Sequence, residues 1–164
     1  MTDQATVLRT SPPSAPETAI AVRIAETQDD FDAILEIRRR VFLEEQGIVE
    51  HRLSDGDDRG SLHVIALDRA EIVASGRITP PRGARGSAQI AWLATLPFHR
   101  GQGCGSAVLQ RLVDLADERR HPSTLLSAQT HALTFYRRFG FRPYGHRFDV
   151  RGIEHQFMER IRRG

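Results

Sequence analysis

The sequence predicts one domain of the mixed α+β class. Two observations lead to this prediction. Short apolar or alternating runs typical of strands are interspersed with amphipathic helical runs, and no internal repeat or linker interrupts them. The chain has 164 residues, and 40% of them are apolar, which suits one compact core rather than two domains.

The first 19 residues are expected to form a disordered tail, and residues 20–164 the folded domain. The tail is polar, rich in Pro, Ser and Thr, and lacks the apolar centre of a secretory signal peptide. No apolar run approaches the roughly 20 residues of a membrane-spanning helix. The only cysteine, Cys104, excludes an internal disulfide and fits a reducing compartment, so we expect a cytoplasmic location.

The first elements are predicted to be a strand and a helix. IAVRI at 20–24 alternates apolar and polar positions, as a strand does. Thr27 and Asp30 have the spacing of a capping box, and apolar residues follow at helical spacing, which predicts a helix over 28–43. The polar, glycine-broken segment 44–61 predicts a long connection.

The remaining segments predict further strands and two more helices. Segments with strand patterns are 62–68, 71–79, 87–95, 123–129, 141–148 and 153–159. The first two are predicted to form a hairpin, and the last two an antiparallel pair. The apolar stripe from Ala107 to Ala116 predicts a helix that ends near residue 119, and 131–140 predicts a short helix ended by Gly140.

A glycine-rich loop, RGQGCGS at 100–106, stands between a predicted strand and a predicted helix. The first N–H groups of a helix are unpaired and bind phosphate where nothing blocks the approach. The loop's glycines have no Cβ and can adopt positive φ, and Arg100 adds a formal charge. The chain contains no lysine for a Walker motif, and G-x-G-x-G is not the dinucleotide fingerprint. The sequence therefore predicts an anion-binding turn of neither common type.

Charge and spacing argue against several other binding functions. The 23 basic residues, all arginine, are nearly balanced by 21 acidic ones, so the clusters Arg38–Arg40 and Arg160–Arg163 are interpreted as solvated surface and not as a nucleic-acid site. DGDD at 55–58 lacks the acidic residues that a calcium loop needs at its fifth and twelfth positions. The seven histidines and one cysteine show no metal-binding spacing. We therefore expect no metal, nucleic acid or membrane partner.

Several motifs together resemble the GNAT acetyltransferases. Arg100, Gly103 and Gly105 fit the signature R/Q-x-x-G-x-G/A, with which that family holds the pyrophosphate of acetyl-CoA. WLATLP before the loop and FYRRFGF after it resemble the family's cofactor-binding strand and second motif. RRRVFLEEQ, DGDD and GIEHQFM further resemble the ElaA-type branch. The likeness spans nearly all of residues 20–160. It implies the GNAT acyl-CoA N-acyltransferase fold, in which helices flank a mixed central β-sheet that splays open at a cofactor wedge.

The resemblance also implies which residues hold acetyl-CoA. In such proteins the strand edge pairs with pantetheine, an N–H near Leu93 polarises the thioester carbonyl, and the glycine loop binds pyrophosphate. Gln129 stands where many members have an asparagine, so its contact with the cofactor is open. The implied cofactor-binding residues are Leu93, Ala94, Thr95, Arg100, Gly101, Gln102, Gly103, Cys104, Gly105, Ser106, Gln129 and Tyr136.

For catalysis the resemblance implies that Tyr136 protonates the departing thiolate. The alternative is that Tyr136 is a core aromatic between two phenylalanines. Glu45 and His155 are the preferred pair of general bases, while a dedicated base is not required. Further candidates bordering the expected acceptor pocket are Glu44, Asp57, Asp58 and His63.

Two hypotheses of different kinds follow for the function. The first is transfer of acetyl from acetyl-CoA to a primary amine of a small molecule or peptide by direct attack in a ternary complex. The second is a regulatory module that binds acyl-CoA without turnover. Within the enzyme hypothesis, Cys104 at a helix start would permit a covalent route, although it lies in the expected pyrophosphate loop. The acceptor stays unspecified, and the assembly is open between a monomer and the homodimer common among similar proteins.

Overall fold

The computed structural model describes residues 20–48, 53–83 and 86–164. The expected disordered tail, residues 1–19, lies outside this part of the chain. Among the described residues, no helix is long and apolar enough to cross a membrane.

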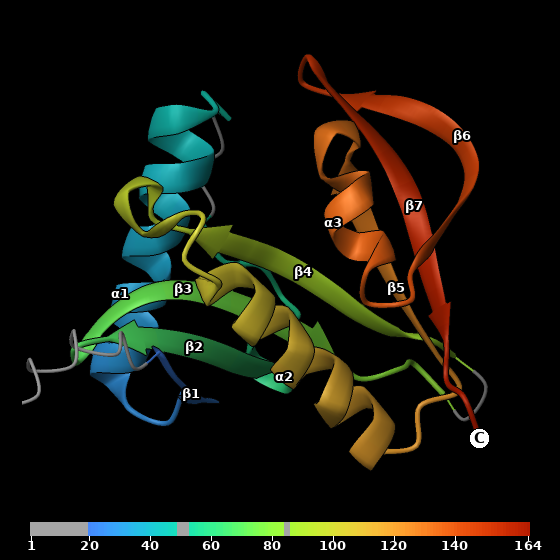
Figure 1. The fold of residues 1–164 in the computed structure, drawn as a ribbon, viewed down its shortest axis with the longest axis horizontal. Helices are drawn as coiled ribbons and strands as arrows, with labels where there is room; N and C mark the ends of the chain where they lie inside the picture. Colours follow the sequence, from blue (N-terminus) through green and yellow to red (C-terminus); the bar gives the residue numbers. More distant parts are fainter. Residues whose placement is uncertain (1–19, 49–52, 84–85) are drawn as a thin grey trace, which may run out of the picture.

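A seven-stranded sheet forms the framework of the described chain (Figure 1). Its strands are β1 (Ile20–Ile24), β2 (Leu62–Asp68), β3 (Glu71–Thr79), β4 (Ala88–Thr95), β5 (Ser123–Gln129), β6 (Arg142–Val150) and β7 (Ile153–Ile161). Their order is β1-β2-β3-β4-β5-β7-β6, and only the β4–β5 pair is parallel. The predicted β2–β3 hairpin and β6–β7 antiparallel pair are confirmed.

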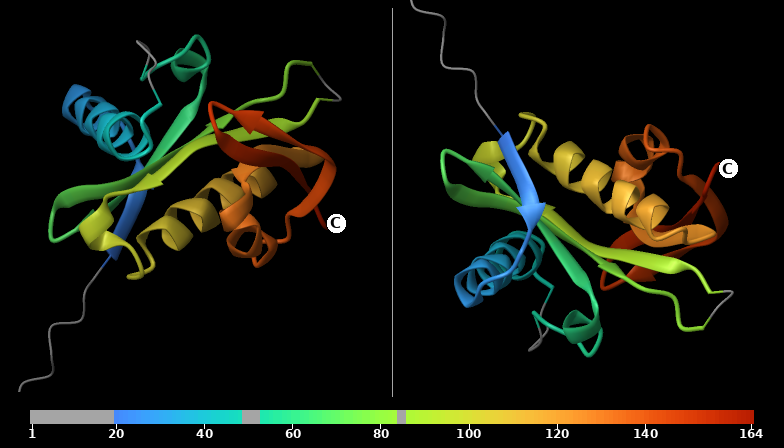
Figure 2. Two further views of the ribbon diagram at one scale, coloured as in Figure 1. Left: turned by 90° about the horizontal axis from the view of Figure 1, so that it is seen from above. Right: turned by 90° about the horizontal axis from the view of Figure 1, so that it is seen from below.

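Helices cover the sheet unequally. Helix α1 (Gln28–Arg38) lies on one face, whereas α2 (Cys104–Glu118) and α3 (Leu133–Arg137) lie on the other (Figure 2). The predicted capping box starts α1, because Thr27 Oγ1 accepts from the N–H of Asp30 and the Asp30 carboxylate accepts from the N–H of Thr27.

Two of the helix predictions are wrong in extent. The predicted α-helix 28–43 ends at Arg38 and continues as a π-helical segment, η1 (Arg39–Glu45), in which the N–H of Gln46 donates to the carbonyl of Val41. The widened turn leaves the apolar spacing almost unchanged, so periodicity did not reveal it. The predicted helix 131–140 is a 3-10 turn followed by the short α3, which ends at Arg137. Gly140, the predicted stop, follows in a turn with a φ of 88°.

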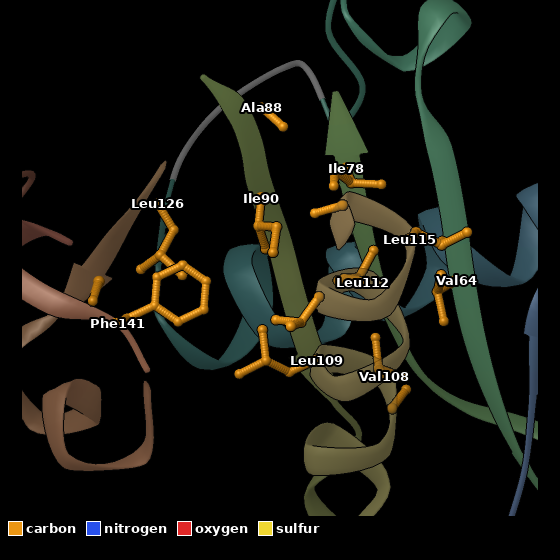
Figure 3. Packing of buried hydrophobic residues seen from close by; sticks show 14 of the residues in the cluster. Val64, Ile78, Ala88, Ile90, Val108, Leu109, Leu112, Leu115, Leu126 and Phe141 are labelled. Carbon is orange, nitrogen blue, oxygen red and sulfur yellow. The ribbon is translucent and has the colours of Figure 1, made fainter. Parts of the chain in front are cut away.

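The core lies between α2 and the sheet. Figure 3 shows Val108, Leu109 and Leu112 of α2 directed at the strands, and these side chains are fully buried. Gly76 of β3 permits this close approach, since a Cβ there would lie 2.8 Å from Cδ1 of Leu112. Leu126 and other buried residues extend the core toward β5.

The sheet splits between β4 and β5 (Figure 1). The two strands pair only at Ala88 with Thr124 and at Gln89 with Leu125. Beyond these pairs β4 stays with β3, while β5 stays with β7 along its whole length. A bulge in β4 accompanies the split, because the β3–β4 register shifts there and Trp92 has a φ of 57°. The strands thus form the expected wedge.

Candidate active site

A cavity of about 1020 Å³ lies in this wedge. Its volume suits a ligand of cofactor size. It is lined by the η1 helix, the diverging part of β4, the start of α2, the end of β5, α3 and the first residues of β7. Segments far apart in the sequence therefore meet at this one site.

The glycine loop forms the wall where α2 begins. Gly101 and Gly103 have φ values of 73° and 87°, so these positions favour glycine. A Cβ at Gly101 would meet nothing within 4 Å, which leaves open space beside the loop. No side chain caps the first turn of α2, so its N–H groups are available to an anion. The loop is thus shaped as the anion-binding turn that the sequence predicts.

Arg100 makes a two-armed ion pair with Glu45 across the cavity wall. Nη1 and Nη2 of Arg100 donate to the two carboxylate oxygens of Glu45 at 2.6 and 2.7 Å, and Nε donates to the carbonyl of Thr95 at 3.1 Å. The hydrogen bonds from Arg100 lower the pKa of Glu45. Glu45 is therefore ionised and already engaged, which weakens it as a proton acceptor.

Tyr136 of α3 lies on the opposite wall and is largely buried. Its ring packs edge-on against Phe135 and Phe141, with centroids 5.1 and 6.2 Å apart. Burial raises the pKa of Tyr136 to about 12. The phenol therefore stays protonated at neutral pH and can act only as a proton donor there.

A polar group of three side chains bridges the wedge. Gln46, just after η1, and Gln129, at the end of β5, exchange amide hydrogen bonds of 2.9 and 3.4 Å. His155 of β7 lies opposite Gln129 in the sheet and lines the same cavity. Nδ1 of His155 lies 2.8 Å from the carbonyl oxygen of Ile153, which can only accept. In the neutral ring this contact places the proton on Nδ1 and leaves Nε2 as an acceptor.

Comparison with known proteins identifies the family. The profile of the acetyltransferase (GNAT) family matches residues 31–141. The chain belongs to this family. It is 27% identical to the uncharacterized N-acetyltransferase YjcF of Bacillus subtilis, over 82% of this chain and 95% of YjcF. It is 28% identical to the protein ElaA of Escherichia coli, over 78% of this chain and 85% of ElaA.

Solved structures agree with the GNAT assignment. The crystal structure of Escherichia coli ElaA superposes with a TM-score of 0.78 at 24% identity, covering 87% of this chain and 99% of ElaA. An acyl-CoA N-acyltransferase from Pseudomonas aeruginosa superposes with a TM-score of 0.76 at 26% identity, covering 87% of this chain and 98% of that protein. The yncA protein of Salmonella typhimurium, solved with its cofactor acetyl-CoA, superposes with a TM-score of 0.71 at 19% identity, covering 87% of this chain and 94% of yncA. The GNAT fold, the ElaA-like branch and the acyltransferase class predicted from the motifs are confirmed.

The GNAT wedge gathers most of the residues selected from the sequence. Gln102 does not line the cavity, and its side-chain amide donates to the carbonyl of Phe98 instead. The selected residues that line it are Leu93, Ala94, Thr95, Arg100, Gly101, Gly103, Cys104, Gly105, Ser106, Gln129, Tyr136, Glu45 and His155. Their individual roles stay predictions.

The other acid–base candidates lie outside the GNAT cavity. Glu44 pairs with Arg39, and Asp57 pairs with the exposed Arg82. Asp58 and the buried His63 belong to a network described below, in which Nε2 of His63 lies 3.0 Å from the carbonyl of Asp58. Burial lowers the pKa of His63, which keeps its ring neutral. None of these groups lines the wedge.

Cys104 is poorly suited to the covalent route. It is buried, and its burial, together with the charge of Asp68, raises the pKa of the thiol. An activated nucleophilic thiol has the opposite shift. The described residues also contain no group of three or more His, Cys, Asp or Glu side chains that could hold a metal ion.

The structure adds candidate residues that the sequence reasoning missed. It also corrects one interpretation, because Arg38, assigned from the sequence to solvated surface, has a side chain that is only 1% exposed. DGDD supplies the exposed Asp55 and the partly buried Asp58 to a network with the buried Arg38 and Arg77, in which Arg38 donates two hydrogen bonds to Asp58 at 2.9 and 3.1 Å. The guanidinium of Arg38 also stacks on Trp92, 4.6 Å from the ring centroid. This network fixes Trp92, which lines the cavity together with Phe42, Gln46, His131 and Arg138. Phe42 and Gln46 fall within RRRVFLEEQ, the signal that could have indicated them.

Proposed function

We propose that this GNAT protein transfers an acetyl group from acetyl-CoA to a primary amine of a small molecule or peptide, by direct attack in a ternary complex in the cytoplasm. The observation that carries the proposal is that the glycine loop and Tyr136 line one cavity between splayed strands. An anion-binding turn and a protonated phenol on the same cavity are what cofactor binding and thiolate release require.

The glycine loop and the edge of β4 would hold the cofactor. N–H groups at the start of α2 and the guanidinium of Arg100 suit the pyrophosphate, and the edge of β4 beyond Gln89 has no strand partner on the β5 side. Pantetheine amides could pair with that edge as an added strand does, with an N–H near Leu93 aimed at the thioester oxygen. Acetyl-CoA supplies the activated acyl group.

Tyr136 and His155 would handle the two protons of the transfer. The amine loses a proton as its nitrogen bonds to the acyl carbon, and Nε2 of His155 is an acceptor for that proton, directly or through water. The C–S bond breaks with its electron pair on sulfur, and the hydroxyl of Tyr136 gives the thiolate its proton. We assign Glu45 to holding Arg100, because its carboxylate is already bound by that guanidinium.

Replacing Tyr136 by Phe tests the proposal. We expect kcat to fall by about 10²- to 10³-fold, because the thiolate loses its proton donor, while the Kd for acetyl-CoA stays within about twofold. Thiol release with pooled amines measures turnover, and calorimetry measures cofactor binding. Thr134→Val is the matched control, since it removes an exposed hydroxyl from the same helix and Thr134 lies outside the cavity lining.

The regulatory module makes a different forecast for the same assay. Under that hypothesis the unmodified protein binds acetyl-CoA but releases no thiol with any amine, polyamine or peptide. Full activity in Tyr136→Phe would remove the tyrosine from the mechanism, and absence of acetyl-CoA binding would reject both hypotheses.

A further inference from the structure

Aromatic side chains border the cavity on the α1 side of the sheet. Phe42 of η1 and Trp92 of β4 pack edge to face, with centroids 5.2 Å apart. Besides the Arg38 stacking, Nε1 of Trp92 donates to Asp55 at 3.2 Å, so the indole is held in place. This wall is therefore a preformed apolar surface.

A second aromatic surface leads outward from His155. The ring of Phe148 stacks on His155 and packs against Phe157, with ring centroids 5.9 and 4.8 Å apart. Phe157 in turn stacks on Tyr144, with centroids 6.0 Å apart. We call Phe148, Phe157 and Tyr144 the aromatic strip. Phe157 and Tyr144 are 44% and 43% exposed. The strip therefore presents rings to solvent that would favour an apolar partner.

The aromatic strip shares its sheet face with the polar group of the cavity. Directly paired residues lie on one face, and Phe157 pairs with Tyr144 while His155 pairs with Gln129. The alternate residues, such as Met158, face α2 and α3 in the core. On the α1 side, no helix of the described chain covers the β5-β7-β6 part (Figure 2). The strip is thus a continuous extension of the cavity wall.

Charge in the cavity disfavours acceptors with several positive charges. Among the described residues of the lining, Glu45 is the only acidic one, and Arg100 occupies both of its oxygens. The other ionisable lining groups include Arg138 and three histidines. A polyamine would find no unpaired carboxylate for its remaining ammonium groups among the lining residues that the structure describes.

We propose that the acceptor is a monoamine with an aromatic or long aliphatic body, whose amine lies at the Gln46–Gln129–His155 group and whose body contacts Trp92 and the aromatic strip. This inference rests on the proposed function and names the substrate class of the same site. Trp92, Phe148 and Phe157 are then specificity-determining residues.

An acceptor panel tests the class. With acetyl-CoA we compare phenethylamine and hexylamine against ethanolamine, putrescine and spermidine by thiol release and product mass. We expect kcat/KM for the first two to exceed the others by at least about tenfold, because each buries an apolar body. Equal or faster acetylation of putrescine or spermidine would overturn the proposal while leaving the acetyltransferase function intact.

Variants on one strand locate the contact. Phe157→Ser is expected to raise KM for phenethylamine about five- to tenfold, leaving kcat and the KM values for ethanolamine and acetyl-CoA unchanged. Ile161→Ser is the control, since Ile161 is on the same strand and face, is 62% exposed, and lies outside the cavity lining. Equal effects of both variants, or none from Phe157→Ser, would count against the strip.

Fluorescence separates a wrong acceptor class from a wrong function. Trp92 is the only tryptophan, so its emission reports directly on the cavity wall. With CoA bound, phenethylamine should change that emission at concentrations at least about tenfold below those needed for putrescine. If no amine is acetylated but this difference is seen, the transferase proposal fails and the binding class stands. If neither amine changes the emission, or putrescine acts first, the class is rejected.

Discussion

Two arginine–carboxylate pairs in this protein have the same geometry in opposite environments. Arg38 meets Asp58 with both arms inside the protein, where its side chain is 1% exposed. Arg100 meets Glu45 with both arms at the cavity rim, where its side chain is 42% exposed. The two pairs therefore differ in what can replace the carboxylate.

Burial decides the role of each pair. No ligand can reach Arg38, and its loss of Asp58 would leave a charge without compensation in the interior. Water and anions can reach Arg100, so a phosphate can take the place of Glu45 at little cost. The buried pair thus holds the framework under Trp92, and the exposed pair keeps a binding residue oriented until a ligand arrives.

Asp58→Asn should give the largest effect, because it breaks the buried pair. We expect the free energy of unfolding to fall by about 3 to 4 kcal/mol at neutral pH, measured by urea denaturation. Asp57→Asn is the matched control. In the described part of the chain the Asp57 carboxylate pairs with the exposed Arg82, so this variant should change stability by about 0.5 kcal/mol or less. Equal losses in both variants would mean that burial does not distinguish the pairs.

The stability difference should also depend on pH. Although burial opposes it, hydrogen bonds from Arg38 and Arg77 lower the pKa of Asp58. The folded-state pKa is thus below that of the unfolded chain, so the contribution is complete above about pH 4 and is lost as the pH falls through the folded value. Denaturation curves of the wild type and Asp58→Asn should therefore converge in acid.

Arg100→Ala should affect binding and leave the fold intact. We expect the Kd for acetyl-CoA to rise about 10- to 100-fold, because charged hydrogen bonds to the pyrophosphate are lost. The free energy of unfolding should change by less than about 1 kcal/mol. Arg111→Ala removes an arginine from the same region, one paired with Glu118 on the helix surface, and should leave the Kd unchanged. A cofactor affinity insensitive to Arg100 would place the pyrophosphate elsewhere.

Glu45→Gln should give the smallest effect. If Glu45 only orients Arg100, its removal should tighten acetyl-CoA binding by up to about fivefold and leave kcat within about twofold, because an exposed ion pair contributes about 1 kcal/mol or less. If Glu45 were the general base, its replacement would instead lower kcat by about 10²-fold or more. Glu44→Gln, which removes the neighbouring carboxylate paired with Arg39, serves as the reference.

The strands were predictable because the burial of each strand's side chains follows the order of apolar and polar residues within that strand. LHVIALD and EIVASGRIT form β2 and β3 at the predicted bounds, and IAVRI forms β1. The π-helical η1 was not predictable, since a widened turn preserves the apolar spacing. The split after Gln89 was implied by the family likeness alone, because strand pairing is set by tertiary contacts that periodicity does not record.

The site was predictable only where a motif is continuous. The loop at 100–106 could be interpreted on its own, because glycines and the helix start act together locally. The partner of Arg100 is 55 residues away, and Gln46 meets Gln129 across 83 residues, so neither pairing had a local signal. Asp57 and Asp58 of DGDD were candidate general bases, yet Asp58 meets Arg38 and Arg77 from other elements and supports the cavity wall instead.

Among the described residues, the two parts of the sheet, β1–β4 and β5–β7–β6, pair only through the short ladder of Ala88–Gln89 with Thr124–Leu125. Beyond this ladder, β4 and β5 present backbone donors and acceptors to a gap that no strand of the described residues fills. Under the proposed function, an extended pantetheine chain would serve as the missing strand and make the hydrogen-bonded sheet continuous. The cofactor would then act as a removable structural part, and amide hydrogens along the edge of β4 should exchange more slowly once it is bound.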